Sequence, residues 1–403
     1  MDVTSAVTQK PKRFSGIDIV KIVAAFFVIG IHTFLYDGYY NYSIPNNKVE
    51  LGAICMRWIA YTCVPLFMIT TGFLMKNKKI SKKYYAGLLP ILFVYLVVSI
   101  ICVLFNKSHY GTVYTAWTFF KGLLMFTDAQ YAWYVEYYIC LFLLLPFINL
   151  GWNELKCAKH RIVFVASVTL ISICSESFFI GAEDPIRLFP GYFPRLYPIA
   201  YYLIGCCIRE YPPKKCILSK VIALFVTLAA LAWLTFTTFH DSINNVDNNY
   251  IFLSKHFNDY GAFPVGMAAV GIFLLLFDIT IRNRIVAKIL TILGKSTLGC
   301  YLISYIFDSM TYMDFCAKYT DVGARLDHIF PVMLKIFGLS MLCGVGLHLL
   351  YEGISLGVKS INLQADEAER REQEIKQQIA EVKAAQAEAE AAAAEQKPSK
   401  KQK

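Results

Sequence analysis

The chain has 403 residues, of which 57% are hydrophobic, 15% aromatic and only 17% charged, and its formal net charge is +10. Soluble domains carry about 25% charged residues, so this composition excludes an ordinary soluble domain and favours an integral membrane protein. The positive charge does not indicate nucleic-acid binding here, because Lys and Arg of membrane proteins collect in cytoplasmic loops. We therefore expect a lipid bilayer as partner and no nucleic acid.

Ten apolar stretches resemble membrane spans, each of which needs about 20 residues in a helix. In chain order they are 17–35, 52–75, 88–105, 131–150, 161–180, 194–208, 217–239, 261–281, 286–307 and 328–358. The expected fold is all-α, a polytopic integral membrane protein with about ten transmembrane helices. No small-residue cleavage site follows the first stretch, which we interpret as an anchor and not as a signal peptide.

The basic residues between the spans predict the orientation. With the N-terminus inside, five cytoplasmic segments hold eighteen Lys and Arg, whereas the longer outer segments hold eight. All five segments then follow the positive-inside rule. An even number of spans returns the chain to the cytoplasm, so both termini are expected there.

Three regions follow from this pattern: a cytoplasmic N-terminus (1–16), a transmembrane domain (17–360) and a charged tail (361–403). The tail is rich in Ala, Glu, Gln and Lys, which are strong helix formers. Its apolar stripe is too thin to predict a long coiled coil. We expect a cytoplasmic helix that frays into a disordered basic end, and homo-oligomerisation remains open.

The twelve cysteines lie mostly in or beside apolar runs, with no C-x-x-C pair and no Cys/His spacing that suits zinc. We interpret them as small buried hydrophobic side chains and expect no metal site.

The first span contains the most informative polar residues. In GIDIVKIVAAFFVIGIHTF, Asp18, Lys21, Ala25 and His32 fall within roughly 60° around the helix, so this stripe must face protein or water. Asp18 and Lys21 are close enough to pair. His32 lies roughly 21 Å from Asp18 along the axis. It is either a hydrogen-bonded contact between helices or a proton-transfer residue, and the shared stripe favours the second.

These residues resemble the opening motif of the acyltransferase-3 family of membrane O-acyltransferases, an Asp, a basic residue three positions on and a His eleven positions later. Four other segments resemble family motifs in the expected order: CVPLFMITTGFLM (63–75), AWYVEYYICLFLLLPFINL (132–150), RLYPIAYYLIGCCI (195–208) and LGKSTLGCYLIS (293–304). The resemblance covers about 15–310 and leaves the tail out.

Three positions depart from the family pattern. Lys21 stands where Arg is usual, and Lys cannot make the bidentate contacts of Arg. The loop 76–83 carries Lys where the family is rich in Arg, and Ser304 occupies the place of a usual His.

The resemblance implies an acyltransferase of the bacterial cytoplasmic membrane. It would move an acyl group, most commonly acetyl, from cytoplasmic acyl-CoA to a hydroxyl of an extracytoplasmic carbohydrate or related cell-surface acceptor, with no bound cofactor. His32 would act as general base or as a transient acyl carrier. Glu136 would orient His32 or bind a sugar.

Donor and acceptor residues are also implied. The expected donor-binding residues are Asp18, Lys21, Lys82 and Lys83, the last two in a basic loop that is otherwise only a topology signal. The expected acceptor-binding residues are Trp133, Tyr134 and Arg195. The alternative for the two aromatic residues is an interfacial belt, and the alternative for Arg195 is a helix anchor.

Two other functions remain open from sequence. A transporter or exporter of a polar metabolite or glycan precursor would line its path with Asp18, Lys21, His32 and Glu136. A sensor or scaffold would instead recruit partners through the tail.

Overall fold

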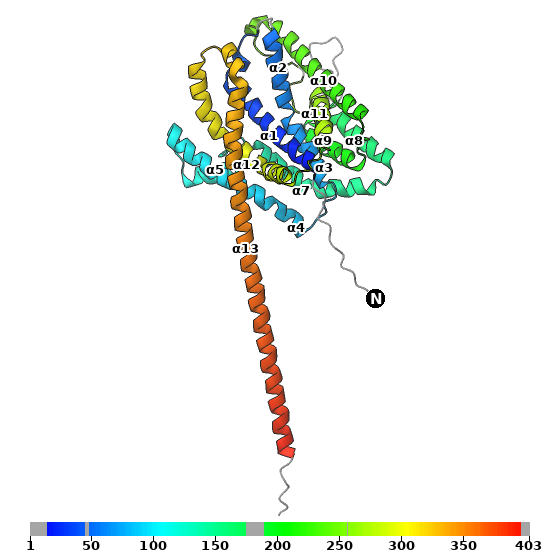
Figure 1. The fold of residues 1–403 in the computed structure, drawn as a ribbon, viewed down its shortest axis with the longest axis vertical. Helices are drawn as coiled ribbons and strands as arrows, with labels where there is room; N and C mark the ends of the chain where they lie inside the picture. Colours follow the sequence, from blue (N-terminus) through cyan, green and yellow to red (C-terminus); the bar gives the residue numbers. More distant parts are fainter. Residues whose placement is uncertain (1–13, 45–47, 175–188, 256, 396–403) are drawn as a thin grey trace, which may run out of the picture. The chain divides into compact units, whose positions relative to one another are not determined.

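The computed structural model describes residues 14–44, 48–174, 189–255 and 257–395. Within these ranges the chain is helical, and its β structure is a single isolated bridge between Ser43 and Ile251. The all-α fold is confirmed for this part of the chain (Figure 1). The α-helices are α1 (Ser15–Tyr36), α2 (Lys48–Tyr61), α3 (Cys63–Met75), α4 (Lys82–Tyr85), α5 (Leu89–Tyr110), α6 (Ala116–Leu124), α7 (Trp133–Glu154), α8 (Ala158–Ser172), α9 (Tyr197–Glu210), α10 (Ile217–Ile243), α11 (Phe263–Leu276), α12 (Arg284–Lys318) and α13 (Val322–Glu395).

Seven helical stretches of the described chain are long and apolar enough to cross a membrane: Ser15–Tyr36, Glu50–Met75, Lys82–Tyr110, Trp133–Glu154, Ile217–Ile243, Arg284–Lys318 and Val322–Ile361. The other three predicted spans coincide with α8, α9 and α11, which have 15, 14 and 14 residues. At 1.5 Å per residue these helices are about 21 Å long, shorter than the ~30 Å hydrocarbon core. Part of the predicted span 161–180 lies outside the described residues. The number of ten spans and the N-in/C-in orientation therefore stay predictions.

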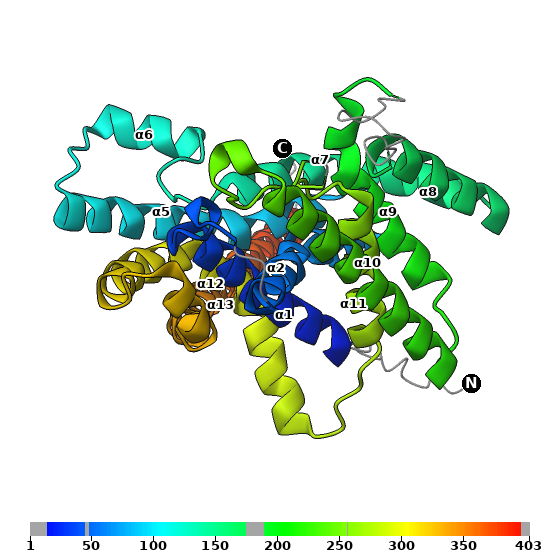
Figure 2. The same ribbon diagram turned by 90° about the horizontal axis from the view of Figure 1, so that it is seen from above.

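The helices differ in how much of their surface other helices cover. In the most apolar window of Glu50–Met75, 67% of the residues are buried, compared with 22% in Lys82–Tyr110. Figure 2 shows α1 and α2 surrounded by other helices, with α5 at an edge. The outward face of α5 carries large aliphatic side chains at a spacing of four residues, which suits contact with lipid. They are Leu92, Leu96, Ile100 and Leu104.

Glycine lets α3 and α9 cross at backbone contact. A Cβ on Gly72 of α3 would overlap the carbonyl oxygen of Tyr202 in α9, and a Cβ on Gly205 of α9 would overlap the carbonyl oxygen of Ile69. Inside lipid, helices have no hydrophobic driving force to associate and depend on close packing instead. Small residues at the contact allow that packing. The Gly-Phe-Leu segment of α3 and the Ile-Gly segment of α9 are thus packing motifs.

A buried asparagine ties three segments together on the side of α3 where it ends. The Asn149 amide of α7 donates to the carbonyl oxygens of Met75 and Lys78, both at 2.9 Å. Its carbonyl oxygen accepts from the Tyr202 hydroxyl at 2.6 Å. Because its donors and acceptor are all used, this polar group is tolerated in an apolar bundle. The network holds the start of the lysine-rich loop 76–83 against α7 and α9.

The chain divides into two units, residues 1–348 and 349–403. Of the second unit, residues 349–395 are described and continue α13 as helix. The domain limits expected from sequence, at 16/17 and 360/361, stay predictions.

Candidate active site

The polar stripe of α1 faces protein. Only 4% of the surface of Asp18 and 9% of that of His32 is exposed, and Ala25 between them is completely buried. The spacing of these residues in an otherwise apolar helix predicts this arrangement, because a lipid-facing charge would be costly.

A cavity of about 240 Å³ runs beside this stripe. Both Lys21 and His32 line it, as do Val28 and Ile31 between them. Lys21 and His32 are eleven positions apart in the helix, so the cavity follows α1 for about 16 Å. The opposite wall comes chiefly from α3, α7 and α12, and most of its side chains are apolar. The cavity thus joins two ionisable groups of one helix through an apolar passage.

His32 has two close neighbours. Its Nδ1 atom lies 3.7 Å from Oδ2 of Asp308, which is completely buried in α12. Its ring packs on that of Tyr131, with the centroids 3.7 Å apart and the planes inclined by 33°. Among the described residues, His32 Nδ1 and Asp308 Oδ1 have no hydrogen-bond partner. A histidine with a carboxylate on its Nδ1 side can hold a proton there and offer Nε2 for proton transfer.

Tyr131 completes the surroundings of Asp308. Its hydroxyl donates to Asp308 Oδ2 at 2.7 Å, and its backbone carbonyl accepts a hydrogen bond from the Tyr301 hydroxyl. Three segments distant in sequence, α1, the turn before α7, and α12, therefore meet at His32.

Sequence reasoning missed Asp308. The signal was present, because a carboxylate in the apolar run YLISYIFDSM must be paired or functional. It follows Ser304, the position where the family usually has His, by one helical turn. The Ser304 hydroxyl is buried and donates to the carbonyl of Tyr301 at 2.8 Å, so its hydrogen bond stays within α12.

Asp18 lies away from His32, against α12. The hydroxyl of Thr291 is 3.5 Å from Asp18 Oδ2, and a Cβ on Gly294 would approach Asp18 Oδ1 to 2.7 Å. The glycine of the segment 293–304 therefore makes room for this carboxylate. Asp18 does not line the cavity that Lys21 and His32 share.

The lysine-rich loop lies where α3 ends. Lys82 and Lys83 are exposed at the start of α4, whose N-cap Ser81 accepts from the backbone of Tyr84. Lys76 pairs with Glu210 of α9, which also lies 3.1 Å from Arg161. These cations hold the pKa of the Glu210 carboxyl below its usual range, chiefly through the hydrogen bond from Lys76. The loop thus exposes the charges of Lys82 and Lys83, while its first residue, Lys76, is held by an ion pair.

Glu136 and the predicted acceptor residues separate into two groups. Trp133 and Tyr134 line the cavity, with 39% of Trp133 exposed. Glu136 and Arg195 are both exposed and do not line it. Arg195 contributes its backbone carbonyl, which accepts from the Tyr137 hydroxyl at 2.8 Å. The structure therefore places His32, Lys21, Trp133 and Tyr134 along one cavity and leaves Glu136 and Arg195 at the surface.

A family model described as an acyltransferase domain matches residues 14–349. The chain belongs to the acyltransferase-3 family. This match includes every side chain that lines the cavity, and it ends one residue into the second unit. Comparisons with curated proteins and with solved structures find no match. The protein is thus a multi-pass membrane acyltransferase whose shared domain contains the His32 cavity.

Proposed function

We propose that this acyltransferase moves an acyl group, most simply acetyl, from cytoplasmic acyl-CoA to a hydroxyl of an extracytoplasmic carbohydrate or related cell-surface acceptor. The observation that carries the proposal is the cavity along α1, because it connects Lys21, near the predicted cytoplasmic end, with His32, near the predicted outer end. An acyl thioester that enters from one side could reach a histidine that the acceptor approaches from the other.

His32 supports two routes of acyl transfer. As general base, Nε2 takes the proton of the acceptor hydroxyl while the acceptor oxygen attacks the thioester carbonyl. The CoA thiolate then leaves and is protonated. As acyl carrier, Nε2 itself attacks the thioester, and CoA leaves as a thiolate that is then protonated. The acceptor oxygen next attacks the acyl carbon, the bond from that carbon to Nε2 breaks, and the proton of the acceptor hydroxyl passes to the freed imidazole. In both routes the carboxylate of Asp308, 3.7 Å from Nδ1, stabilises the positive charge that develops on the ring.

The donor end is cationic. The exposed Lys82 and Lys83 would attract the phosphates of CoA as point charges, and Lys21 would meet the pantetheine arm inside the cavity. The apolar wall between Lys21 and His32 suits an uncharged thioester.

The test uses the full chain in nanodiscs with radiolabelled acetyl-CoA, and follows both CoA release and label transfer. We expect His32→Ala to lower the rate by about 10²- to 10⁴-fold, the range of general acid–base catalysis. The matched control is His160→Ala, which changes an exposed histidine at the start of α8.

Equal rates in His32→Ala and wild type would remove His32 from the mechanism. If wild type neither bound nor turned over acyl-CoA, the acyl-transfer proposal would fail. Uptake or efflux of a polar metabolite by the same nanodisc preparation reconstituted into vesicles would then favour the transporter.

A further inference from the structure

We propose that residues 258–261, between α10 and α11, form the acceptor-binding wall of the cavity. In this proposal the ring of Tyr260 stacks on a pyranoside acceptor, and Arg57 of α2 is the positioning residue that holds the wall. The inference rests on the proposed function and deepens it, because it assigns the acceptor class to a segment that no sequence motif marked.

Tyr260 is the residue of this segment that reaches the cavity. It lines the same cavity as His32, and its ring is nearly parallel to two neighbouring rings. Its centroid is 4.3 Å from that of Tyr61, with planes inclined by 15°, and 5.9 Å from that of Trp133, with planes inclined by 16°. Of these three rings, those of Tyr260 and Trp133 line the cavity, and each joins an apolar ring to a polar group at its edge. Such surfaces suit a ring that has an apolar face and hydroxyls around its rim.

Several hydrogen bonds hold this segment in place. The Tyr201 hydroxyl of α9 donates to the carbonyl of Tyr260 at 2.6 Å, and the Tyr61 hydroxyl donates to the carbonyl of Asn258 at 3.2 Å. The Asn258 side chain accepts from Nη2 of Arg57. Backbone carbonyls that are held by tyrosines of two different helices give the Tyr260 ring a defined position.

Arg57 is buried without a carboxylate partner. Only 2% of its surface is exposed, and no ion pair joins it to an Asp or Glu among the described residues. Its guanidinium carbon lies 4.2 Å from the ring centroids of both Trp58 and Tyr61. A buried cation without a carboxylate is costly, and the aromatic faces offset part of that cost. Outside α2, Arg57 contacts the proposed wall through the side chain of Asn258.

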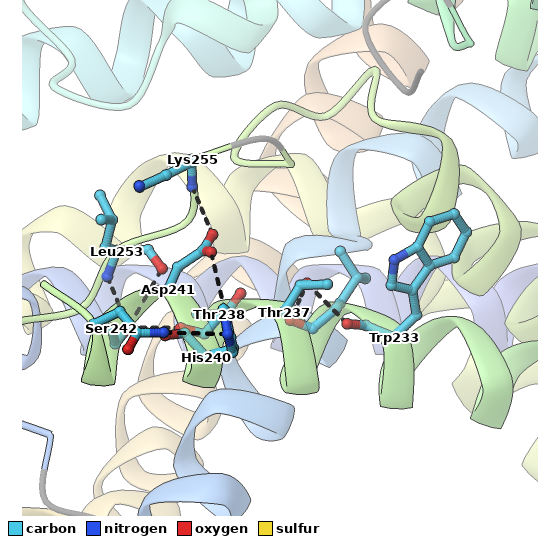
Figure 3. A network of polar contacts seen from close by, with 10 residues as sticks. Trp233, Thr237, Thr238, His240, Asp241, Ser242, Leu253 and Lys255 are labelled. Carbon is cyan, nitrogen blue, oxygen red and sulfur yellow. Dashed lines mark hydrogen bonds and ion pairs between the residues drawn. The ribbon is translucent and has the colours of Figure 1, made fainter. Parts of the chain in front are cut away.

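The preceding part of the same connection is anchored separately to α10, as Figure 3 shows. The backbone amide of Leu253 donates to Ser242 Oγ at 2.9 Å, and that of Lys255 donates to Asp241 Oδ2 at 3.2 Å. Because Leu253 and Lys255 are held on α10, and Asn258 and Tyr260 on α2 and α9, the wall is built into the bundle. A preformed wall of this kind loses little conformational freedom when a ligand binds.

The experiment measures acetyl transfer by the full chain in nanodiscs to two probes, methyl β-D-glucopyranoside and the open-chain polyol glycerol. Hydrolysis of acetyl-CoA without acceptor is measured in parallel. We expect wild type to acetylate the glucoside in preference to glycerol. Tyr260→Ala should raise the KM for the glucoside roughly three- to tenfold, the value of a ring stack, whereas Tyr260→Phe keeps the ring and should resemble wild type.

The positioning role is tested from both ends of its contact. Arg57→Lys keeps the charge, and Asn258→Ala removes the acceptor from an exposed side chain and leaves the buried arginine in place. Both should raise the KM for the glucoside without a matching rise in the KM for acetyl-CoA, whereas a general folding defect would lower every rate. Tyr192→Ala, at a ring that is 67% exposed, is the control and should change none of them.

Three results would overturn the inference: an unchanged KM for the glucoside in Tyr260→Ala, an equal rise in the KM for acetyl-CoA, or equal acetylation of glycerol and glucoside by wild type. Wild type that releases CoA but does not acetylate the glucoside would also overturn it, with the proposed acyl transfer intact. Wild type that releases no CoA at all would overturn both.

Discussion

A carboxyl group inside a membrane helix is costly unless protein surrounds it and gives it a partner, and Asp308 has both. It is completely buried, accepts a hydrogen bond from Tyr131, and lies 3.7 Å from Nδ1 of His32. The distance is longer than a hydrogen bond. A small movement of either side chain as substrate enters would close it, as catalytic contacts often tighten on binding.

Asp308→Asn removes the charge and keeps the shape of the side chain. We expect the turnover number to fall by about 10²-fold or more, because the amide no longer stabilises the positively charged ring. The KM for acetyl-CoA should stay close to that of wild type, since the donor end of the cavity lies about 16 Å away along α1. Kinetics with labelled acetyl-CoA measure both quantities.

Asp314→Asn is the matched control, because Asp314 lies on the same helix and is exposed. Its turnover should equal that of wild type. An Asp308→Asn enzyme with normal turnover would show that this carboxylate serves the packing of α12 alone.

At the residue scale, sequence reasoning worked along one helix and failed between helices. The stripe of Asp18, Lys21 and His32 follows from a period of 3.6 residues, so the burial of Asp18 and His32 was predictable. The meeting of His32 with Asp308 depends on how α1 packs against α12, and one sequence without its relatives does not contain that information. Glu136 was predicted from its place in an aromatic segment at the start of a span, and the structure places it in the first turn of α7 with an exposed side chain.

At the element scale, the positions of the helices were easier to predict than their lengths. Pro198 and Pro264 stand in the first turns of α9 and α11, where the missing amide costs nothing and the ring favours a helix start. Both helices then end after 14 residues, although apolar residues continue beyond α11. Hydrophobicity predicts which segments are buried, but helix ends depend on local backbone contacts that composition does not report.

The crossing of α3 and α9 gives a prediction at this scale. Gly72→Ala places a methyl group against the carbonyl oxygen of Tyr202, so the two helices must separate or distort. We expect the free energy of unfolding to fall by roughly 1–3 kcal/mol, the usual range for overpacking. Thermal denaturation of the detergent-solubilised protein, followed by tryptophan fluorescence, should show a lower Tm.

Gly151→Ala provides the comparison for this variant. Gly151 is a helical glycine of α7, and outside its own stretch of helix no heavy atom lies within 4 Å of the position that an alanine methyl group would take, so alanine should leave the Tm unchanged or raise it slightly. Equal Tm values for Gly72→Ala and Gly151→Ala would mean that the α3–α9 contact tolerates separation, and that the glycine is not required there.

At the scale of the whole molecule, the family domain and the tail are different in kind. The family model and the cavity both belong to the part of the chain before the tail, with the cavity lined by residues from Lys21 to Tyr301. The sequence of the tail is built from helix-forming and charged residues, and the described part, up to residue 395, is helical. An acyltransferase would therefore not need residues 361–403, whereas a protein that recruits partners through its tail would need them.

Truncation after residue 360 distinguishes acyl transfer from partner recruitment. If the protein acts as an acyltransferase through its His32 cavity, the truncated chain should keep its turnover and its KM for acetyl-CoA within about twofold. The family domain and every residue that lines the cavity precede residue 361, and independent sites perturb each other by only a few tenths of a kcal/mol. Size-exclusion chromatography of both chains in the same detergent shows whether the tail changes the oligomeric state. Loss of acyl transfer at an unchanged Tm would contradict this expectation, since it would show that the tail takes part in the reaction or assembles the active form. Retained transfer together with a smaller oligomer would instead assign the tail to self-association and leave the chemistry in residues 14–349.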